Sequence, residues 1–192
     1  MFPIRDHNPS NRTPYVTYTL MAANILIFLA YFPELSANEL ALGQFYYTFG
    51  LVPADGTAFT YLSSIFLHGG WMHLIGNMLF LWIFGDNLED LLGHVGFLLF
   101  YLASGAAAAW GQVIADTDSV VPMVGASGAI AGVMGGYLLM FPRARIDVLV
   151  IIFIIFKIFP MPAWLMLGIW FALQLVNGLA MDLAGGGVAY WA

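Results

Sequence analysis

The chain has 192 residues, of which 61% are hydrophobic and only 8% charged, and its mean hydropathy is +0.87. A water-soluble domain of this length carries far more charge, so the excess apolar surface must face lipid. The formal net charge of -6, without a basic cluster, gives no support for a nucleic-acid partner, and the lack of cysteine excludes disulfides, thiolate metal sites and a cysteine nucleophile.

Residues 1–14 are polar and lack the apolar core and small-residue cleavage site of a signal peptide. A transmembrane helix needs about 20 mostly apolar residues. We therefore predict an all-α fold, a polytopic membrane helical bundle that forms a single domain over residues 1–192. The predicted spans are residues 15–32, 71–85, 91–113, 125–141 and 163–180, with the start of a sixth at 187.

An apolar, β-branched run at residues 148–156 is too short to cross the bilayer. Arg145 and Lys157 flank it, and Pro160 and Pro162 follow. We interpret this run as a segment that lies in the membrane interface or packs among the helices.

The distribution of positive charge predicts the orientation in the membrane. Arg5 and Arg12 precede the first predicted span, and Arg143 and Arg145 follow the fourth, so both pairs lie on one side. Lysine and arginine gather on the cytoplasmic side of membrane proteins. We therefore expect a cytoplasmic N-terminus, and the compact chain favours a bacterial plasma membrane. The aromatic-rich connection 33–70 then lies outside, at the level of the headgroups.

Polar side chains open two of the predicted spans. His73 and Asn77 are four residues apart and share one helix face, and Ser127 lies at the start of the fourth span. Both helices run inward from the outer surface, so the three side chains lie at similar depth, within about two turns of that surface. We therefore predict an outward-facing pocket that brings together a hydroxyl, an imidazole and a carboxamide.

The start of the fourth predicted span suits both close packing and anion binding. Gly128, Gly132 and Gly136 recur at four-residue spacing on one face, the pattern that lets helix backbones approach in lipid. Ser127 lies at a helix N-terminus, where unpaired N–H groups favour a developing oxyanion.

Each of these residues, taken singly, also has a structural interpretation. A serine in a membrane helix usually bonds its own helix or a neighbour, and a histidine–asparagine pair often only links two helices. Trp170 and Phe171 fit lipid-facing or packing aromatics, and His94 fits an interfacial residue. The combination of motifs shifts the balance towards a site.

Several motifs occur in a fixed order along the chain: Tyr47-x-x-Gly50-Leu51-Val52-Pro53-Ala54, His68-x4-His73-x3-Asn77 with Phe84-Gly85, Tyr101-Leu102, Gly125-Ala126-Ser127-Gly128, and Pro162-Ala163 before Trp170-Phe171. This ordered set resembles the rhomboid family of intramembrane serine proteases over nearly the whole chain. The resemblance implies a six-helix core and an enzyme that cleaves transmembrane segments of other proteins near the outer face, with no cofactor or metal. The implied roles are nucleophile for Ser127, oxyanion hole for His73 and Asn77, support of the site for His68, Gly125 and Gly128, and substrate gate for Trp170 and Phe171.

One element of the family's pattern is missing from these residues. Its general base is a histidine early in the sixth helix, after an alanine, whereas all four histidines here precede Ser127 and the last residue is Ala192. We expect the histidine to follow Ala192 in the parent protein. Since an unactivated serine is a weak nucleophile, we expect very little activity from the 192 residues alone.

Two other functions compete with proteolysis. A non-catalytic rhomboid-like protein that binds membrane clients needs the scaffold but no base. A transporter or metal site built on His68, His73 and His94 is disfavoured, because His94 lies near the opposite membrane face. Metalloprotease and aspartyl-protease chemistry fit poorly, because His-Glu-x-x-His is absent and the acids cluster at span ends.

Overall fold

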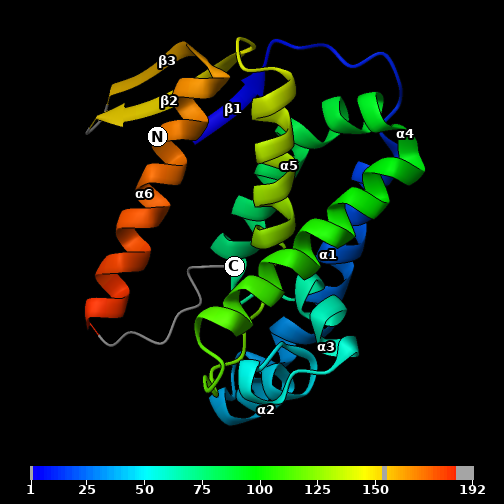
Figure 1. Ribbon diagram of the computed structural model, residues 1–192, viewed down its shortest axis with the longest axis vertical. Helices are drawn as coiled ribbons and strands as arrows, with labels where there is room; N and C mark the ends of the chain where they lie inside the picture. The colour runs from blue at the N-terminus through cyan, green and yellow to red at the C-terminus, as the bar shows by residue number, and fades with distance from the viewer. Residues whose placement is uncertain (1, 153–154, 185–192) are drawn as a thin grey trace.

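The computed structural model describes residues 2–152 and 155–184, with a group of helices and a small sheet across one end (Figure 1). The helices are α1 (Tyr15–Leu35), α2 (Glu39–Phe49), α3 (Ala58–Ser63), α4 (Trp71–Ala115), α5 (Ser127–Met140) and α6 (Ala163–Ala184), with 3-10 turns η1 (Pro53–Asp55) and η2 (Ser64–Phe66). The strands are β1 (Phe2–Asp6), β2 (Arg145–Ile152) and β3 (Ile155–Pro162). The sixth predicted span, from residue 187, lies outside the described residues.

Two of the described helices, Tyr15–Leu35 and Trp71–Ala115, are long and apolar enough to cross a membrane. Ser127–Met140 and Ala163–Gln174 are shorter apolar helices. Helix α4 is two helices in one, because Gly93 has φ 71° and ψ 164° and breaks the helical path there. Each half is then close to the length of about 20 residues that a span needs.

The gap predicted at residues 86–90, between the second and third spans, is helical instead. Its acidic residues do not end the helix, because their carboxylates bind the N-terminal segment. Asp86 accepts a hydrogen bond from Ser10 Oγ (2.9 Å), and Glu89 accepts the backbone N–H groups of Val16 and Thr17 (2.8 and 2.7 Å). Glu89 thus caps α1, whose N-cap residue Pro14 offers no side-chain hydrogen bond.

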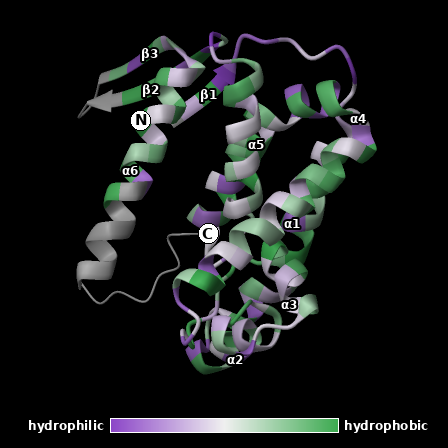
Figure 2. Ribbon diagram, in the orientation of Figure 1, coloured by the Kyte–Doolittle hydropathy of each residue, from purple (hydrophilic) through white to green (hydrophobic). Residues whose placement is uncertain are grey.

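The apolar run at residues 148–156 belongs to a β-hairpin, so the prediction of an all-α chain is wrong here. Strands β2 and β3 pair antiparallel from Arg145 with Pro162 to Ile152 with Ile155, and β1 pairs with β2 on its other side. Arg5 and His7 attach the N-terminal segment to Asp147 of β2. A side-chain nitrogen of each lies 2.8 Å from an oxygen of the Asp147 carboxylate. The segment between β1 and α1 is hydrophilic, whereas apolar residues run along the helices (Figure 2).

The connection 33–70 is more structured than a loop. It contains α2, α3 and both 3-10 turns, and the side chain of Asn38 caps α2 by accepting the N–H groups of Leu40 and Ala41. Its aromatic residues pack on α1: the ring of Phe45 stacks on the ring of Tyr31 in α1, with ring centroids 4.5 Å apart. This compact unit covers the end of the helices that carries the start of α4.

Glycines allow α5 to pack tightly on both halves of α4. A Cβ atom added to Gly132 would overlap the Cβ of Ser104, and one added to Gly136 would lie 2.8 Å from Leu88 Cδ2. The predicted glycine face of the fourth span therefore makes the expected close helix contact.

We expect Gly132→Ala to destabilise the protein by about 1–3 kcal/mol, because the added methyl group overlaps the Ser104 side chain and backbones must separate. Gly135→Ala is the matched control, since a Cβ there meets nothing within 4 Å. Unfolding of the two variants in detergent, followed by circular dichroism, checks this. Equal midpoints for both variants would contradict the close contact.

Candidate active site

The first turns of α4 present His73 and Asn77 towards the start of α5. The backbone N–H of Gly69 donates to His73 Nδ1 at 3.3 Å. A neutral imidazole has one donor and one acceptor nitrogen, so this bond places the proton of His73 on Nε2. His73 Nε2 is therefore a hydrogen-bond donor.

The turn before α5 brings Ser127 to that donor. Gly125 has φ 138°, a conformation that side chains other than glycine rarely adopt, and its N–H donates to the Ser64 carbonyl at 2.9 Å. A Cβ built on Gly125 would lie 2.7 Å from His73 Nε2 and 3.4 Å from Ser127 Oγ. His73 Nε2 and Ser127 Oγ therefore both lie next to Gly125, and the distance between them cannot exceed the sum of these two distances.

Ser127 is the first residue of α5, where helix N–H groups lack partners within the helix. The N-cap residue, Ala126, has no side chain that can cap them. Asn77 adds another free donor, because its buried Nδ2 makes no hydrogen bond to any residue of the described ranges. A hydroxyl, backbone N–H groups, an imidazole N–H and a carboxamide N–H therefore meet in one place.

Ser127, His73 and Asn77 line one cavity of about 620 Å³. Its walls are otherwise mainly apolar, with Met72, Phe80, Met123, Ile130 and Met134. An oxyanion formed on a ligand in this cavity would be stabilised strongly, because donors act more effectively where water is scarce. Such an arrangement can serve acyl transfer to serine.

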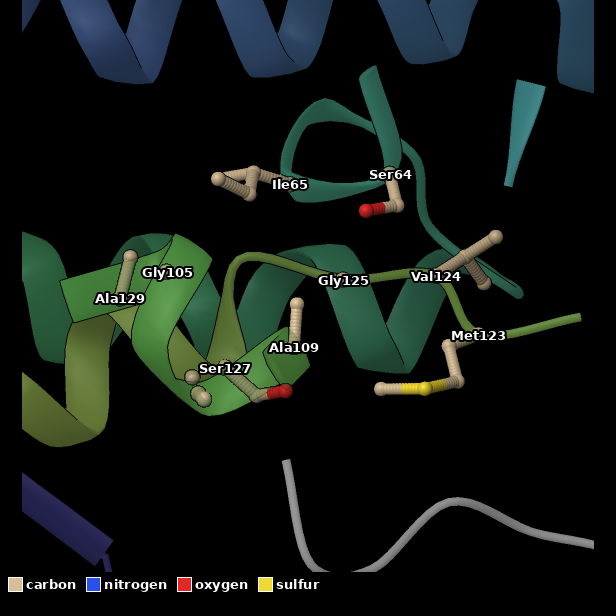
Figure 3. A pocket seen from close by; sticks show the side chains of 11 residues that line it. Ser64, Ile65, Gly105, Ala109, Met123, Val124, Gly125, Ser127 and Ala129 are labelled. Carbon is tan, nitrogen blue, oxygen red and sulfur yellow. The ribbon is translucent and has the colours of Figure 1, made fainter. Parts of the chain in front are cut away.

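A smaller cavity of about 40 Å³ lies behind Ser127 (Figure 3). Ser64 and Ser127 lie on opposite sides of the segment that carries Gly125, and Gly105, Gly128 and Ala109 also line the space. The volume is sufficient for a water molecule. Gly125 and Gly128 thus both border this smaller cavity.

The ring of His68 packs against the ring of His73, with ring centroids 5.1 Å apart. Its backbone is fixed by two tyrosines, because its carbonyl accepts hydrogen bonds from Tyr31 and Tyr46 hydroxyls at 2.7 and 2.9 Å. Burial, reinforced by the nearby His73 ring, lowers the pKa of His68 to about 3, so its ring is neutral.

Helix α6 forms one wall of the large cavity through Trp170, which contacts Phe80 with ring centroids 5.7 Å apart. Phe171, predicted as part of the same gate, packs against Trp170 but does not line the cavity. Gln174, one turn after Trp170, does line it and was missed from the sequence. A polar residue in an apolar span is itself a signal of a site, which would have identified Gln174.

His94 lies away from this group. It bonds Glu89 beside the break in α4 at Gly93, a whole helix length from His73. Among the described residues, no cluster of three or more histidine, aspartate or glutamate side chains is arranged to hold a metal ion.

The fold and the cavity define a class: a helical membrane protein with a serine at a helix N-terminus beside several free donors. The family model described as "Rhomboid domain" matches residues 55–192. The chain belongs to the rhomboid family, whose members are membrane proteins, and the resemblance seen in its motifs is confirmed.

Curated relatives include proteases. The chain is 37% identical over 129 residues to Rhomboid protease GluP of Bacillus subtilis, covering 67% of this chain and 25% of that one. Putative rhomboid protease YdcA of the same organism is 35% identical over 128 residues (66% and 62%), and Rhomboid protein 1, mitochondrial, of Saccharomyces cerevisiae is 34% identical over 128 residues (65% and 33%). The match thus spans less than two thirds of each relative's length.

Proposed function

We propose that this protein is an intramembrane serine endopeptidase that cleaves transmembrane segments of other membrane proteins. The observation that supports this most is the meeting of Ser127 with the donors of His73 and Asn77 in one mainly apolar cavity. The protease names of two Bacillus relatives agree with hydrolase chemistry. The proposed location is a bacterial plasma membrane, with the N-terminus in the cytoplasm.

In the proposed reaction, Ser127 Oγ attacks a peptide carbonyl in a locally unfolded substrate segment. The Ser127 N–H, His73 Nε2–H and Asn77 Nδ2–H stabilise the tetrahedral oxyanion, and each donor contributes about 2.7–4 kcal/mol. The leaving amine takes a proton, and water then releases the acyl-enzyme. The small cavity behind Ser127 offers a place for that water.

The Ser127 proton requires a base. His73 is unsuited, because Gly69 occupies its Nδ1 and its Nε2 carries the proton. Lys157 belongs to the hairpin at the far end of the helices. The proposed base is therefore the histidine that the family resemblance places after Ala192.

The alternative is a rhomboid-like protein that binds membrane clients without cleaving them. It needs the lateral wall formed by α6 but no aligned donors around Ser127. The unpaired Asn77 Nδ2 and the Nε2–H tautomer of His73 favour catalysis, because a binding scaffold gains nothing from a buried unsatisfied donor.

Covalent labelling tests the proposal. The full-length protein in detergent is treated with a fluorophosphonate probe, and we expect a single adduct on Ser127 by peptide mass mapping. Labelling needs an activated serine but no transmembrane substrate. A folded protein that stays unlabelled, and leaves a panel of transmembrane reporters uncut, would refute the protease and favour client binding.

A further inference from the structure

The β2–β3 hairpin reaches beyond the sheet that supports it. Strand β1 pairs with β2 no farther than Leu149, whereas β2 and β3 continue to pair up to Ile152 with Ile155. Residues 150–152 and 155–157, the outer half of the hairpin, therefore have no third strand among residues 2–152 and 155–184. Strands β2 and β3 run across the end of the helices where α6 begins (Figure 1).

The two strands of this hairpin differ in exposure, although both are mainly apolar. In β2, Ile146 and Val148 are fully buried, but in β3 Phe156 is 67% exposed, Ile158 56% and Phe159 46%. A two-stranded hairpin is marginally stable in water, and an exposed apolar edge strand promotes aggregation. Something other than water must cover this surface.

The surrounding surface indicates that the cover is lipid. Trp164 at the start of α6 is exposed directly after β3, and exposed Tyr18 stacks on exposed Trp82 near β1. Exposed tryptophan and tyrosine mark the headgroup level of a bilayer. The exposed apolar residues of the hairpin lie in the chain just before Trp164, and α6 carries further exposed apolar residues, including Leu173.

The charge of the hairpin indicates which type of lipid it would bind. Asp147, the acidic residue of the hairpin, forms an ion pair with Arg5 and lies within hydrogen-bond distance of His7. Arg143, Arg145 and Lys157 form no ion pair within residues 2–152 and 155–184. The hairpin therefore carries uncompensated positive charge beside its apolar surface, a combination that binds anionic phospholipid.

We propose that the exposed part of β3, residues 156–159, inserts into the headgroup–acyl boundary of the leaflet opposite Ser127 and prefers anionic phospholipid there. Because β3 ends at Pro162 and α6 begins at Ala163, this anchor also fixes the base of the helix that carries Trp170. The proposal does not depend on proteolysis.

The lack of cysteine makes single spin labels straightforward. We place labels at Phe156→Cys and Ile158→Cys, with Leu139→Cys on α5 (82% exposed) as the lipid-facing control and Val120→Cys (62% exposed), between α4 and α5, as the aqueous control. The full-length protein is reconstituted in phosphatidylcholine vesicles with or without phosphatidylglycerol. Collisions with oxygen, which enters lipid, and with a water-soluble nickel chelate are measured.

We expect labels at 156 and 158 to collide with oxygen and not with nickel, as at 139, and to move deeper when phosphatidylglycerol is present. Lys157→Gln should reduce that lipid dependence. Nickel accessibility equal to that at 120 would overturn the insertion. Dipolar broadening, or labels shielded from both reagents, would show that protein covers the hairpin and would also overturn the insertion. Equal depth in both lipids would overturn the preference for anionic phospholipid.

Discussion

Ser127→Ala abolishes cleavage of a transmembrane reporter reconstituted with the full-length protein, if Ser127 is the nucleophile we propose. Loss of a nucleophilic serine lowers kcat by a factor on the order of 10⁶ in a serine protease, because the acyl-enzyme cannot form. The Ser127 hydroxyl makes no hydrogen bond to the described residues, so the free energy of unfolding should change by no more than about 0.5 kcal/mol. Gel-based cleavage and a denaturation curve measure the two effects.

Ser63→Ala provides the comparison for this experiment. Its hydroxyl donates to the Phe49 carbonyl at 2.6 Å, and Ser63 lines neither of the two cavities at Ser127. We expect Ser63→Ala to cleave at close to the original rate. Undiminished cleavage by Ser127→Ala would show that another residue attacks the substrate.

The placement of the site followed from helical periodicity. His73 and Asn77 share a face because they are four residues apart, and Ser127 lies at a similar depth because both helices start at one surface. These are local properties, which a single sequence contains. The tautomer of His73 could not be predicted in this way. It depends on a hydrogen bond from the backbone N–H of Gly69, whose position just before α4 is not specified by residue types.

The sheet could not be predicted in the same way. Residues 148–156 are apolar and β-branched, and a short run of this kind suits a buried strand, a helix segment or an interfacial segment equally. The decisive partner, β1, lies about 140 residues away in a segment that looks like a polar tail. Likewise, the helix through residues 86–90 depends on donors from Ser10, Val16 and Thr17, which are distant in sequence.

Gly125→Ala should abolish most activity although it adds only a methyl group. The φ of 138° costs about 1–3 kcal/mol for a residue with a side chain, and the new Cβ would lie 2.7 Å from His73 Nε2 and 2.8 Å from Cε1. Either the turn or the His73 ring must move. Since the loss of one oxyanion donor costs 10²–10³ in kcat, we expect a fall of about that size or more.

Gly70→Ala separates this effect from a general intolerance of change near His73. Gly70 has φ 167° and ψ 173°, an extended conformation open to any residue, and a Cβ there meets nothing within 4 Å. Its kcat should therefore stay near that of the unmodified protein. If Gly125→Ala cleaves the reporter as fast as Gly70→Ala, the imidazole beside Ser127 is not an oxyanion donor. If both variants lose activity equally, the loss reflects the flexibility of the glycine turns rather than the contact between Gly125 and His73.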